Sequence, residues 1–394
     1  LNKLASNADL KVLSRTSTAK YQSKPEKLKT VSEQLGAATV LEGTVQRAGD
    51  KVRVNVQLID ARADAHIWAK SYDREAKDVF AVESEVSQEV ADALQAKLSP
   101  TEANTLAAAP TKDAEAYDLF LKGEYEEREA EGSLKPESFD RAADFYQQAL
   151  DRDPNFALAA ARLVESRMNR HWFVAKLSEA DLKQVKNIAE HALVLAPNLA
   201  DAHIALGNFY YLGYRQYDTA LQEFQRALDL QPNNLRALEF SAYVHRRRGE
   251  WQRALTELTK CQDRDPRDAS LVANIAAAYC NLRLWQEAIR LGSRSLALDP
   301  HSVLGMRAVV TSYLNGSGDI HEAKRALTTF PPDVRFINKV VIASAPAVIG
   351  EGAYLHVRER VFAGALKGCE NETANPDENR MRPAAREAIL LLPA

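Results

Sequence analysis

The stretch ALDLQPNNLRAL, residues 227–238, decides how most of this chain folds. Pro232 cannot continue a helix, and the residue before a proline avoids the α region, so a helix is predicted to end here. The apolar rhythm of the stretch starts again at Leu235. The pattern therefore predicts the end of one helix followed almost at once by the start of the next.

The same punctuation recurs along the chain. The prolines Pro154, Pro197, Pro232, Pro266 and Pro300 are separated by 43, 35, 34 and 34 residues. A recurring period near 34 residues is typical of stacked helix–turn–helix units. Small residues recur in step with the prolines and would let two antiparallel helices approach closely. They are Gly207, Ala242 and Ala276 on first helices and Ala220, Ala254 and Ala288 on second helices.

Residues 1–98 follow a different pattern, in which strand and helix signals alternate. Residues 27–37 have helical spacing, and residues 38–61 alternate as a hairpin around the turn RAGD. Residues 65–74 are predicted to form a further strand, and residues 76–98 an amphipathic helix. The sequence therefore predicts a small α/β domain in front of the helical repeats.

Both parts resemble known families. The prolines and the alternation of small and large residues over about 114–380 resemble the tetratricopeptide repeat (TPR) family. The segments LKVLSRTST and DVFAVESEVSQEVADAL, with the hairpin between them, resemble the TolB amino-terminal-like domain. That domain precedes TPR arrays in bacterial regulators of the adenylate cyclase and CadC type. Compared with the family, a strand and most of a helix are missing here before LKVLSRTST.

The resemblance implies a mostly α fold, a right-handed α–α superhelix preceded by a small, partial α/β domain. The expected domains are a partial TolB-like domain at 1–98, a linker at 99–113, a TPR array of about six units at 114–380, and the start of a truncated further helix at 381–394. The chain begins with Leu1 and ends in an apolar helix signal, so we expect a piece of a longer polypeptide.

Composition and motifs argue against several classes of function. The net charge of −3 gives no global attraction to nucleic acid, and no apolar run approaches the roughly 18 residues that cross a bilayer. The eight histidines and three cysteines form no metal-ligand spacing, and P-loop, GxGxxG and GxSxG motifs are missing. We therefore expect no catalytic residue, metal or cofactor. The acidic run EYEEREAE (124–131) is interpreted as a solvated helix face.

The TPR resemblance places a binding groove along the first helices of the units. Four arginines among aromatic residues there would hold an acidic or C-terminal peptide through forked hydrogen bonds and stacking. The run HRRRGE is equally typical of a solvated helix end, where the helix dipole favours cations. The predicted groove residues are Asn208, Tyr211, Arg236, Phe240, Tyr243, Arg246, Arg247, Asn274, Asn281 and Arg307.

Two specific groove ligands of TPR proteins are not expected. The two-carboxylate clamp of chaperone-binding members requires Lys and Asn where this chain has Ile204 and Phe240, although Asn208 matches. The asparagine ladder of glycosyltransferase-type arrays is represented only by Asn274. The resemblance therefore implies a peptide groove whose occupant differs from both.

The leading hypothesis is a non-catalytic protein–protein interaction scaffold in a bacterial signalling or transcription regulator. One alternative is the C-terminal regulatory region of a class III adenylate or guanylate cyclase whose catalytic domain lies upstream. Another is an envelope or periplasmic assembly factor. The cysteines Cys261, Cys280 and Cys369 lie far apart and are odd in number, which favours a reducing compartment such as the cytoplasm over a disulfide framework. Cys261 and Cys280 are predicted to be small buried residues of the repeat core. The periplasm and self-association of the chain are left open.

Overall fold

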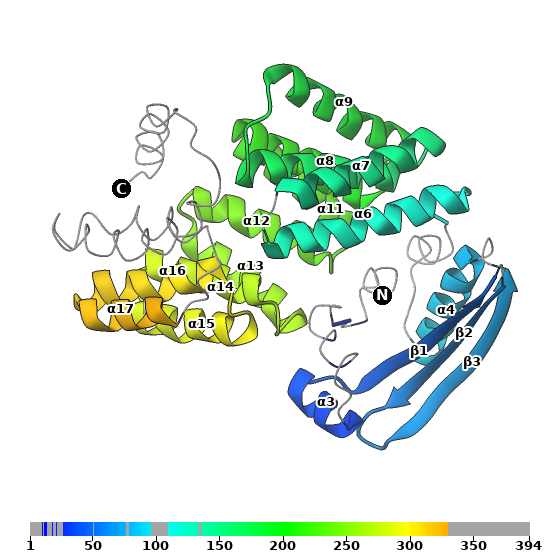
Figure 1. Ribbon diagram of the computed structural model, residues 1–394, viewed down its shortest axis with the longest axis horizontal. Coiled ribbons are helices and arrows are strands. Elements are labelled where there is room, and N and C mark those ends of the chain that lie inside the picture. Colours follow the sequence, from blue (N-terminus) through cyan, green and yellow to red (C-terminus); the bar gives the residue numbers. More distant parts are fainter. Residues whose placement is uncertain are drawn as a thin grey trace, which may run out of the picture. The chain divides into compact units, whose positions relative to one another are not determined.

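The computed structural model describes residues 10, 12, 13, 18, 21, 27–49, 51–75, 79–95, 109–133 and 136–329. It confirms a mostly α fold: the described residues form 14 α-helices and one three-stranded antiparallel sheet (Figure 1). The chain divides into two compact units, Leu1–Asp265 and Pro266–Ala394. The helices predicted within 354–367 and 381–394 lie outside the described residues.

The front of the first unit contains the predicted hairpin, strand and helices. Their bounds are α3 (Leu28–Leu35), β1 (Thr39–Ala48), β2 (Lys51–Asp60), β3 (Ala65–Glu75) and α4 (Val79–Ala93). The strands are antiparallel in the order β1-β2-β3, with Ala48 opposite Lys51 and Gly49 in the left-handed region at φ 62° between them. Helix α4 lies along one face of the sheet (Figure 1), where Val90 packs with the buried Leu58 of β2.

The remaining described residues form antiparallel helical hairpins, each of which we call a repeat. In the first unit these are α6 (Ala114–Ser133) with α7 (Pro136–Arg152), α8 (Ala157–Phe173) with α9 (Glu179–Leu195), α10 (Ala200–Asn208) and the π-helical turn η2 (Phe209–Gly213) with α11 (Tyr217–Leu230), and α12 (Leu235–Arg247) with α13 (Trp251–Arg264). The second unit contains α14 (Ala269–Asn281) with α15 (Trp285–Leu298), and α16 (Val303–Ser312) and the π-helical turn η3 (Tyr313–Ser317) with α17 (Ile320–Thr328).

The helix boundary predicted from ALDLQPNNLRAL is confirmed. Helix α11 ends at Leu230 and α12 begins at Leu235, with Pro232 between them. The side chain of Asn234 accepts a hydrogen bond from the backbone N–H of Ala237 at 3.0 Å, which satisfies one donor at the start of α12. The joint therefore stops one helix by proline chemistry and starts the next by an asparagine cap.

Small residues bring the two helices of a hairpin together, as the sequence predicts. A Cβ atom at Gly207 would lie 2.4 Å from Cε1 of Phe224, and one at Gly123 would lie 2.5 Å from Cε1 of Tyr146. Only glycine fits under these rings, because real Cβ atoms do not approach so closely. The small residues predicted on the second helices, Ala220, Ala254 and Ala288, are fully buried.

Two further sequence features are visible in the described part of the chain. Cys261 is buried, as predicted, and its thiol lies 3.7 Å from the carbonyl oxygen of Leu235, whereas Cys280 is half-buried. Within the same residues, none of the helices combines the length and apolar character that crossing a bilayer requires.

Candidate functional site

The first helices of the four repeats in the first unit carry polar residues at equivalent positions. Glu124 of α6, Glu165 of α8, Asn208 of α10 and Tyr243 of α12 each directly follow a buried residue in their helix. Glu165 and Asn208 are 43 residues apart, the same spacing as Pro154 and Pro197. The repeat therefore lines these side chains up across neighbouring helices.

An ion pair between alternate repeats marks the concave side of this stack. Arg236 of α12 donates to Glu165 of α8, 71 residues earlier, and so reaches past α10. In a curved stack of repeats, first helices two repeats apart approach each other only on the inner side of the curve. We therefore assign the line of polar residues to the inner face of the stack, and we call this face the groove of the first unit.

The floor of this groove is a network of charged and amide side chains. Arg162 pairs with Glu165 at 2.9 Å and with Asp201 at 3.2 Å, and Arg236 also lies 3.5 Å from Asp201. Arg162 Nε lies 2.8 Å from Glu124 Oε1 without hydrogen-bond geometry. We call the following seven residues the groove-floor network: Glu124, Glu127, Arg162, Glu165, Asp201, Asn208 and Arg236.

Burial dominates the electrostatics of the groove-floor network. It raises the pKa of Glu165 to about 8, although the charge of Arg162 acts in the opposite direction. Burial also raises the pKa of Glu127, against hydrogen bonds from Ser166 and Asn169. For Arg162, burial alone would lower the pKa, but the surrounding carboxylates outweigh it and raise the pKa. The network therefore retains a bound proton at neutral pH.

Toward the C-terminal ends of the first helices, the groove is lined by cationic and aromatic side chains instead of carboxylates. Lys176 Nζ and Arg247 Cζ lie 5.2 Å and 5.3 Å from the ring centroid of Trp172, and Arg246 lies 5.0 Å from that of Tyr243. Cations at this distance are attracted by the aromatic quadrupole. Burial and the neighbouring charge of Arg215 lower the pKa of Lys176. The groove-end cluster is Trp172, Lys176, Tyr211, Tyr243, Arg246 and Arg247.

The predicted groove residues of the first unit fall into both groups. Asn208 and Arg236 belong to the groove-floor network, where Arg236 is already paired with carboxylates. Tyr211 is only 3% exposed and packs against Trp172 at 5.8 Å between ring centroids. Phe240 stacks on Phe224 at 5.8 Å and lies edge-on to Tyr243. Tyr243 also donates to Glu239, so each predicted residue of the first unit contacts another residue of the protein itself.

The predicted residues of the second unit have local partners. Asn274 and Asn281 of α14 donate to the carbonyl oxygens of Ser270 and Ala277 in their own helix, at 3.0 Å and 2.8 Å. Arg307 is an exposed residue of α16. Assignment of these three residues to a groove stays a prediction.

Several residues of the groove were missed. The run EYEEREAE was interpreted as a solvated helix face, which is wrong for Glu124 and Glu127: the side chain of Glu124 is 22% exposed and paired, and burial shifts the pKa of Glu127. Glu127 accepts a hydrogen bond from Asn169, 42 residues later, at 3.1 Å. Carrying the repeat spacing back through the longer second unit would have placed these acids beside Arg162 and Glu165.

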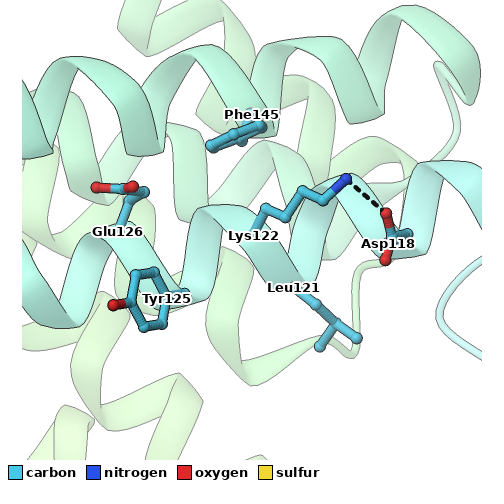
Figure 2. A pocket seen from close by; sticks show the side chains of 6 residues that line it. All are labelled: Asp118, Leu121, Lys122, Tyr125, Glu126 and Phe145. Carbon is cyan, nitrogen blue, oxygen red and sulfur yellow. Dashed lines mark ion pairs between the residues drawn. The ribbon is translucent and has the colours of Figure 1, made fainter.

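Helices α6 and α7 of the first repeat line a shallow hollow of about 280 Å³. Figure 2 shows Leu121 and Tyr125 of α6 beside it, together with Phe145 of α7. Two of the residues that line the hollow, Lys122 and Asp118, form an ion pair with each other at 2.7 Å. Because this hollow is open and its charges are matched, the concave groove is the stronger candidate for a binding site.

Comparisons with known proteins agree with the repeat architecture. A family model described as "Anaphase-promoting complex, cyclosome, subunit 3" matches residues 213–292, which run from the end of η2 into α15. The helical hairpins of the described residues have the architecture of tetratricopeptide repeats. Arrays of this kind present extended concave surfaces to proteins and typically have no catalytic role.

One curated relative is "Putative adenylate cyclase 3" of Rhizobium meliloti (strain 1021), which is 36% identical over 160 residues. The match covers 41% of this chain and 27% of that protein, so most of the relative lies outside it.

Similar solved structures include YrrB, described as a TPR protein with an unusual peptide-binding site, at 16% identity and a TM-score of 0.36 over 55% of this chain and 99% of that chain. TTC0263, a thermophilic TPR protein of Thermus thermophilus, has 16% identity and a TM-score of 0.41 over 50% and 98% of the two chains. PilF of Pseudomonas aeruginosa has 15% identity and a TM-score of 0.39 over 59% and 99%.

Proposed function

We propose that the tetratricopeptide repeats of this chain bind an extended, acidic segment of a protein partner in the groove of the first unit, and that the chain itself is non-catalytic. The observation that carries this proposal is the groove-end cluster, where Lys176 and Arg247 lie over the ring of Trp172. An aromatic ring beneath two cations offers a partner both stacking area and charge-assisted hydrogen bonds.

The electrostatics of the groove-end cluster favour an anionic group. Lys176, Arg215, Arg246 and Arg247 bring four positive charges to the ends of the first helices, and the pKa of Lys176 is lowered by burial and by Arg215. Among the described residues no carboxylate lies within 4.0 Å of the Arg247 guanidinium. A carboxylate of a bound segment would relieve this repulsion. Arg236 contributes less than expected, because Glu165 and Asp201 already neutralise it.

The test uses blocked, degenerate nonapeptide libraries in which one position at a time is fixed as Glu or Ala. We expect the purified chain to prefer Glu at one position by about tenfold, and the double variant Lys176→Glu, Arg247→Glu to lose that preference. Arg290→Glu, an exposed cation of α15 whose side chain pairs with Glu287, is the matched control and should bind as the unmodified chain does. An acidic preference that survives in the double variant would refute the assignment.

A second candidate concerns the larger protein. We propose that the chain is the regulatory region of a bacterial signalling protein such as a nucleotide cyclase, with its catalytic domain elsewhere in the polypeptide. The 36% identity to a relative named as an adenylate cyclase supports this role, as does the resemblance of residues 1–98 to the TolB amino-terminal-like domain. The division into domains at 1–98 and 114–380 belongs to the same proposal.

Cyclic nucleotide production by the full-length gene product tests the regulatory role. We expect Arg247→Glu in that protein to change the response of the cyclase to an acidic partner peptide while basal production stays constant. A gene with no catalytic domain upstream of Leu1 would end this candidate. We place the protein in the cytoplasm, consistent with Cys261 and Cys280, which form no disulfide among the described residues. A reporter fused after residue 394 distinguishes this from the periplasm.

A further inference from the structure

We propose that the groove-floor network is a subsite for a basic side chain, lysine or arginine, of the segment that lies in the groove. This inference rests on the proposed function, because it names the chemistry of a second contact made by the same partner segment. The partner would therefore carry an acidic group for the groove-end cluster and a basic group for the groove-floor network.

The first argument is the charge balance of the network. Four carboxylates, those of Glu124, Glu127, Glu165 and Asp201, surround the two guanidinium groups of Arg162 and Arg236. Glu165 is only 2% exposed, so water does little to screen the excess negative charge around it. A third cation would balance the network further, whereas a carboxylate of a partner would be repelled from it.

The second argument comes from hydrogen-bond acceptors that have no donor. Asn208 is fully buried, and its Nδ2 donates to Glu165 Oε1 at 3.4 Å. Its Oδ1 has no hydrogen-bond partner among the described residues, and neither has Oε2 of Glu127. A buried acceptor without a donor costs free energy. The third atom of the network without a hydrogen-bond partner, Arg162 Nε, is a donor that already lies 2.8 Å from Glu124 Oε1. A ligand that donates would therefore satisfy the two orphaned acceptors.

Lysine and arginine side chains fit this requirement. An ammonium group carries three N–H donors and a guanidinium group five, and neither has an acceptor. The network reaches solvent at Glu124 and Asp201, whose side chains are 22% and 18% exposed. Arg236 already approaches Glu165 and Asp201 from the neighbouring repeat and is partly exposed. It demonstrates that a long cationic side chain fits over these carboxylates.

The two subsites also set a spacing for the partner. Glu165 and Trp172 are both on α8, seven residues apart, which corresponds to about 10 Å along the helix axis. An extended peptide advances roughly 3.3 Å per residue, so its acidic and basic side chains would be about three residues apart. This spacing is specific enough to test in a peptide library.

Binding of a cation should be coupled to release of a proton. Glu165 faces Glu124 and Glu127 of α6, Tyr146 of α7, Arg162 of its own helix, Asp201 of α10 and Arg236 of α12. Burial raises the pKa of Glu165 to about 8, so this carboxyl holds a proton in the free network below that pH. A bound cation favours the ionised carboxylates, so affinity should rise with pH toward 8, by up to about tenfold per pH unit, and then level off.

The experiment uses the full chain and blocked nonapeptide libraries with Glu fixed at its preferred position and Lys, Arg, Ala or Glu fixed three residues to either side. We expect a preference of about tenfold for Lys or Arg over Ala on one side. Glu127→Gln keeps the shape of the side chain and should reduce the preference to less than about threefold, as should Asn208→Leu. Glu190→Gln, an exposed acid of α9 that pairs with Lys186, is the matched control.

The outcomes separate this inference from the proposed function. If no library binds, both fail. If acidic peptides bind but Lys and Arg gain nothing over Ala, or if Glu127→Gln retains the full basic preference, this subsite fails and the groove-end assignment stands. Thermal unfolding followed by circular dichroism identifies any variant that does not fold. The pH profile of the unmodified chain then decides: affinity for the Lys peptide that is flat between pH 6 and pH 8 overturns the inference.

Discussion

In the first unit, Arg162 of α8 reaches carboxylates on α6 and α10, and Arg236 reaches back across two repeats. In the second unit, Asn274 and Asn281 of α14 donate to carbonyl groups that lie one turn earlier in the same helix. Both regions are built from the same helical hairpin. The first uses its first helices to connect neighbouring repeats through charged groups. In the second, the two asparagines of α14 bond within their own helix, and α14 contacts α16 through the neutral thiol of Cys280, which lies 3.3 Å from the hydroxyl of Ser312.

The shared frame comes from small residues at the helix crossings. A Cβ atom at Gly207 would lie 2.4 Å from Phe224, and one at Gly292 would lie 2.9 Å from the carbonyl oxygen of Gly305. These contacts hold helices together in both units without any charged group. The comparison therefore separates the residues that build a repeat from the residues that give its concave face a chemical character.

The largest effect is expected from Arg162→Met, which removes the guanidinium at the centre of the groove-floor network. Four buried or half-buried carboxylates then lose a counter-charge, and breaking a buried ion pair from one side costs about 3–5 kcal/mol. Urea denaturation measures the loss. The matched change in the other unit, Arg290→Met, affects an exposed pair with Glu287 and should cost less than about 1 kcal/mol. Equal losses would contradict a network that is specific to the first unit.

Glycine substitutions should affect the two units alike. Gly207→Ala forces the ring of Phe224 to move, and Gly292→Ala presses against Val309 and the backbone of Gly305. We expect each change to destabilise its unit by about 1–3 kcal/mol, as overpacking does elsewhere. Gly213→Ala is the control, because its nearest neighbour, Met168, would be 3.5 Å away. A large loss at Gly213 or none at Gly207 would show that close helix approach does not set the frame.

The repeat frame could be predicted from the sequence because its determinants are local and periodic. Gly207 acts within one hairpin and Pro232 at the joint to the next, so a spacing of 34 or 35 residues is enough to find their equivalents. The hairpin of β1 and β2 was predictable for the same reason, since strict alternation and a glycine turn specify it.

The groove could be predicted only in part. The TPR resemblance predicted Asn208 and Arg236 as groove residues, and the structure brings both into contact with Glu165; their role in a binding groove stays a prediction. It could not indicate that Arg236 is neutralised by Glu165, because that contact joins residues 71 positions apart. From sequence alone, an acidic run on a helix is interpreted as solvent-exposed, because the helix that packs against it is not known. Burial of Glu127 depends on α8, whose repeat is lengthened by an insertion.

Proton binding to the network should make the stability of the first unit depend on pH. The pKa of Glu165 is raised to about 8 in the folded protein, above its value of about 4.3 in an unfolded chain. Between these two values the folded state holds a proton that the unfolded state has released, so stability falls as pH rises from about 4.5 to 8. Glu165→Gln should reduce this fall by on the order of 1–2 kcal/mol, measured as urea midpoints at several pH values. An unchanged slope would exclude Glu165 as the site of the proton.

The smallest effects are expected at the helix caps, where the two units use different chemistry at equivalent positions. Asn234 accepts a hydrogen bond from Ala237 N–H at 3.0 Å, and Asp268 accepts one from Leu271 N–H at 2.9 Å. Removing either cap by substitution with Ala should cost about 1 kcal/mol. Asp268 adds a negative charge at the N-terminus of α14, where the helix dipole favours it, so part of its contribution should disappear in 1 M salt. Asn234 is neutral and its contribution should not change with salt.

Ser270→Ala, an exposed position in the first turn of α14, controls for the change to alanine. If salt weakens both caps equally, charge does not distinguish these two joints, and the difference between the units is confined to the groove.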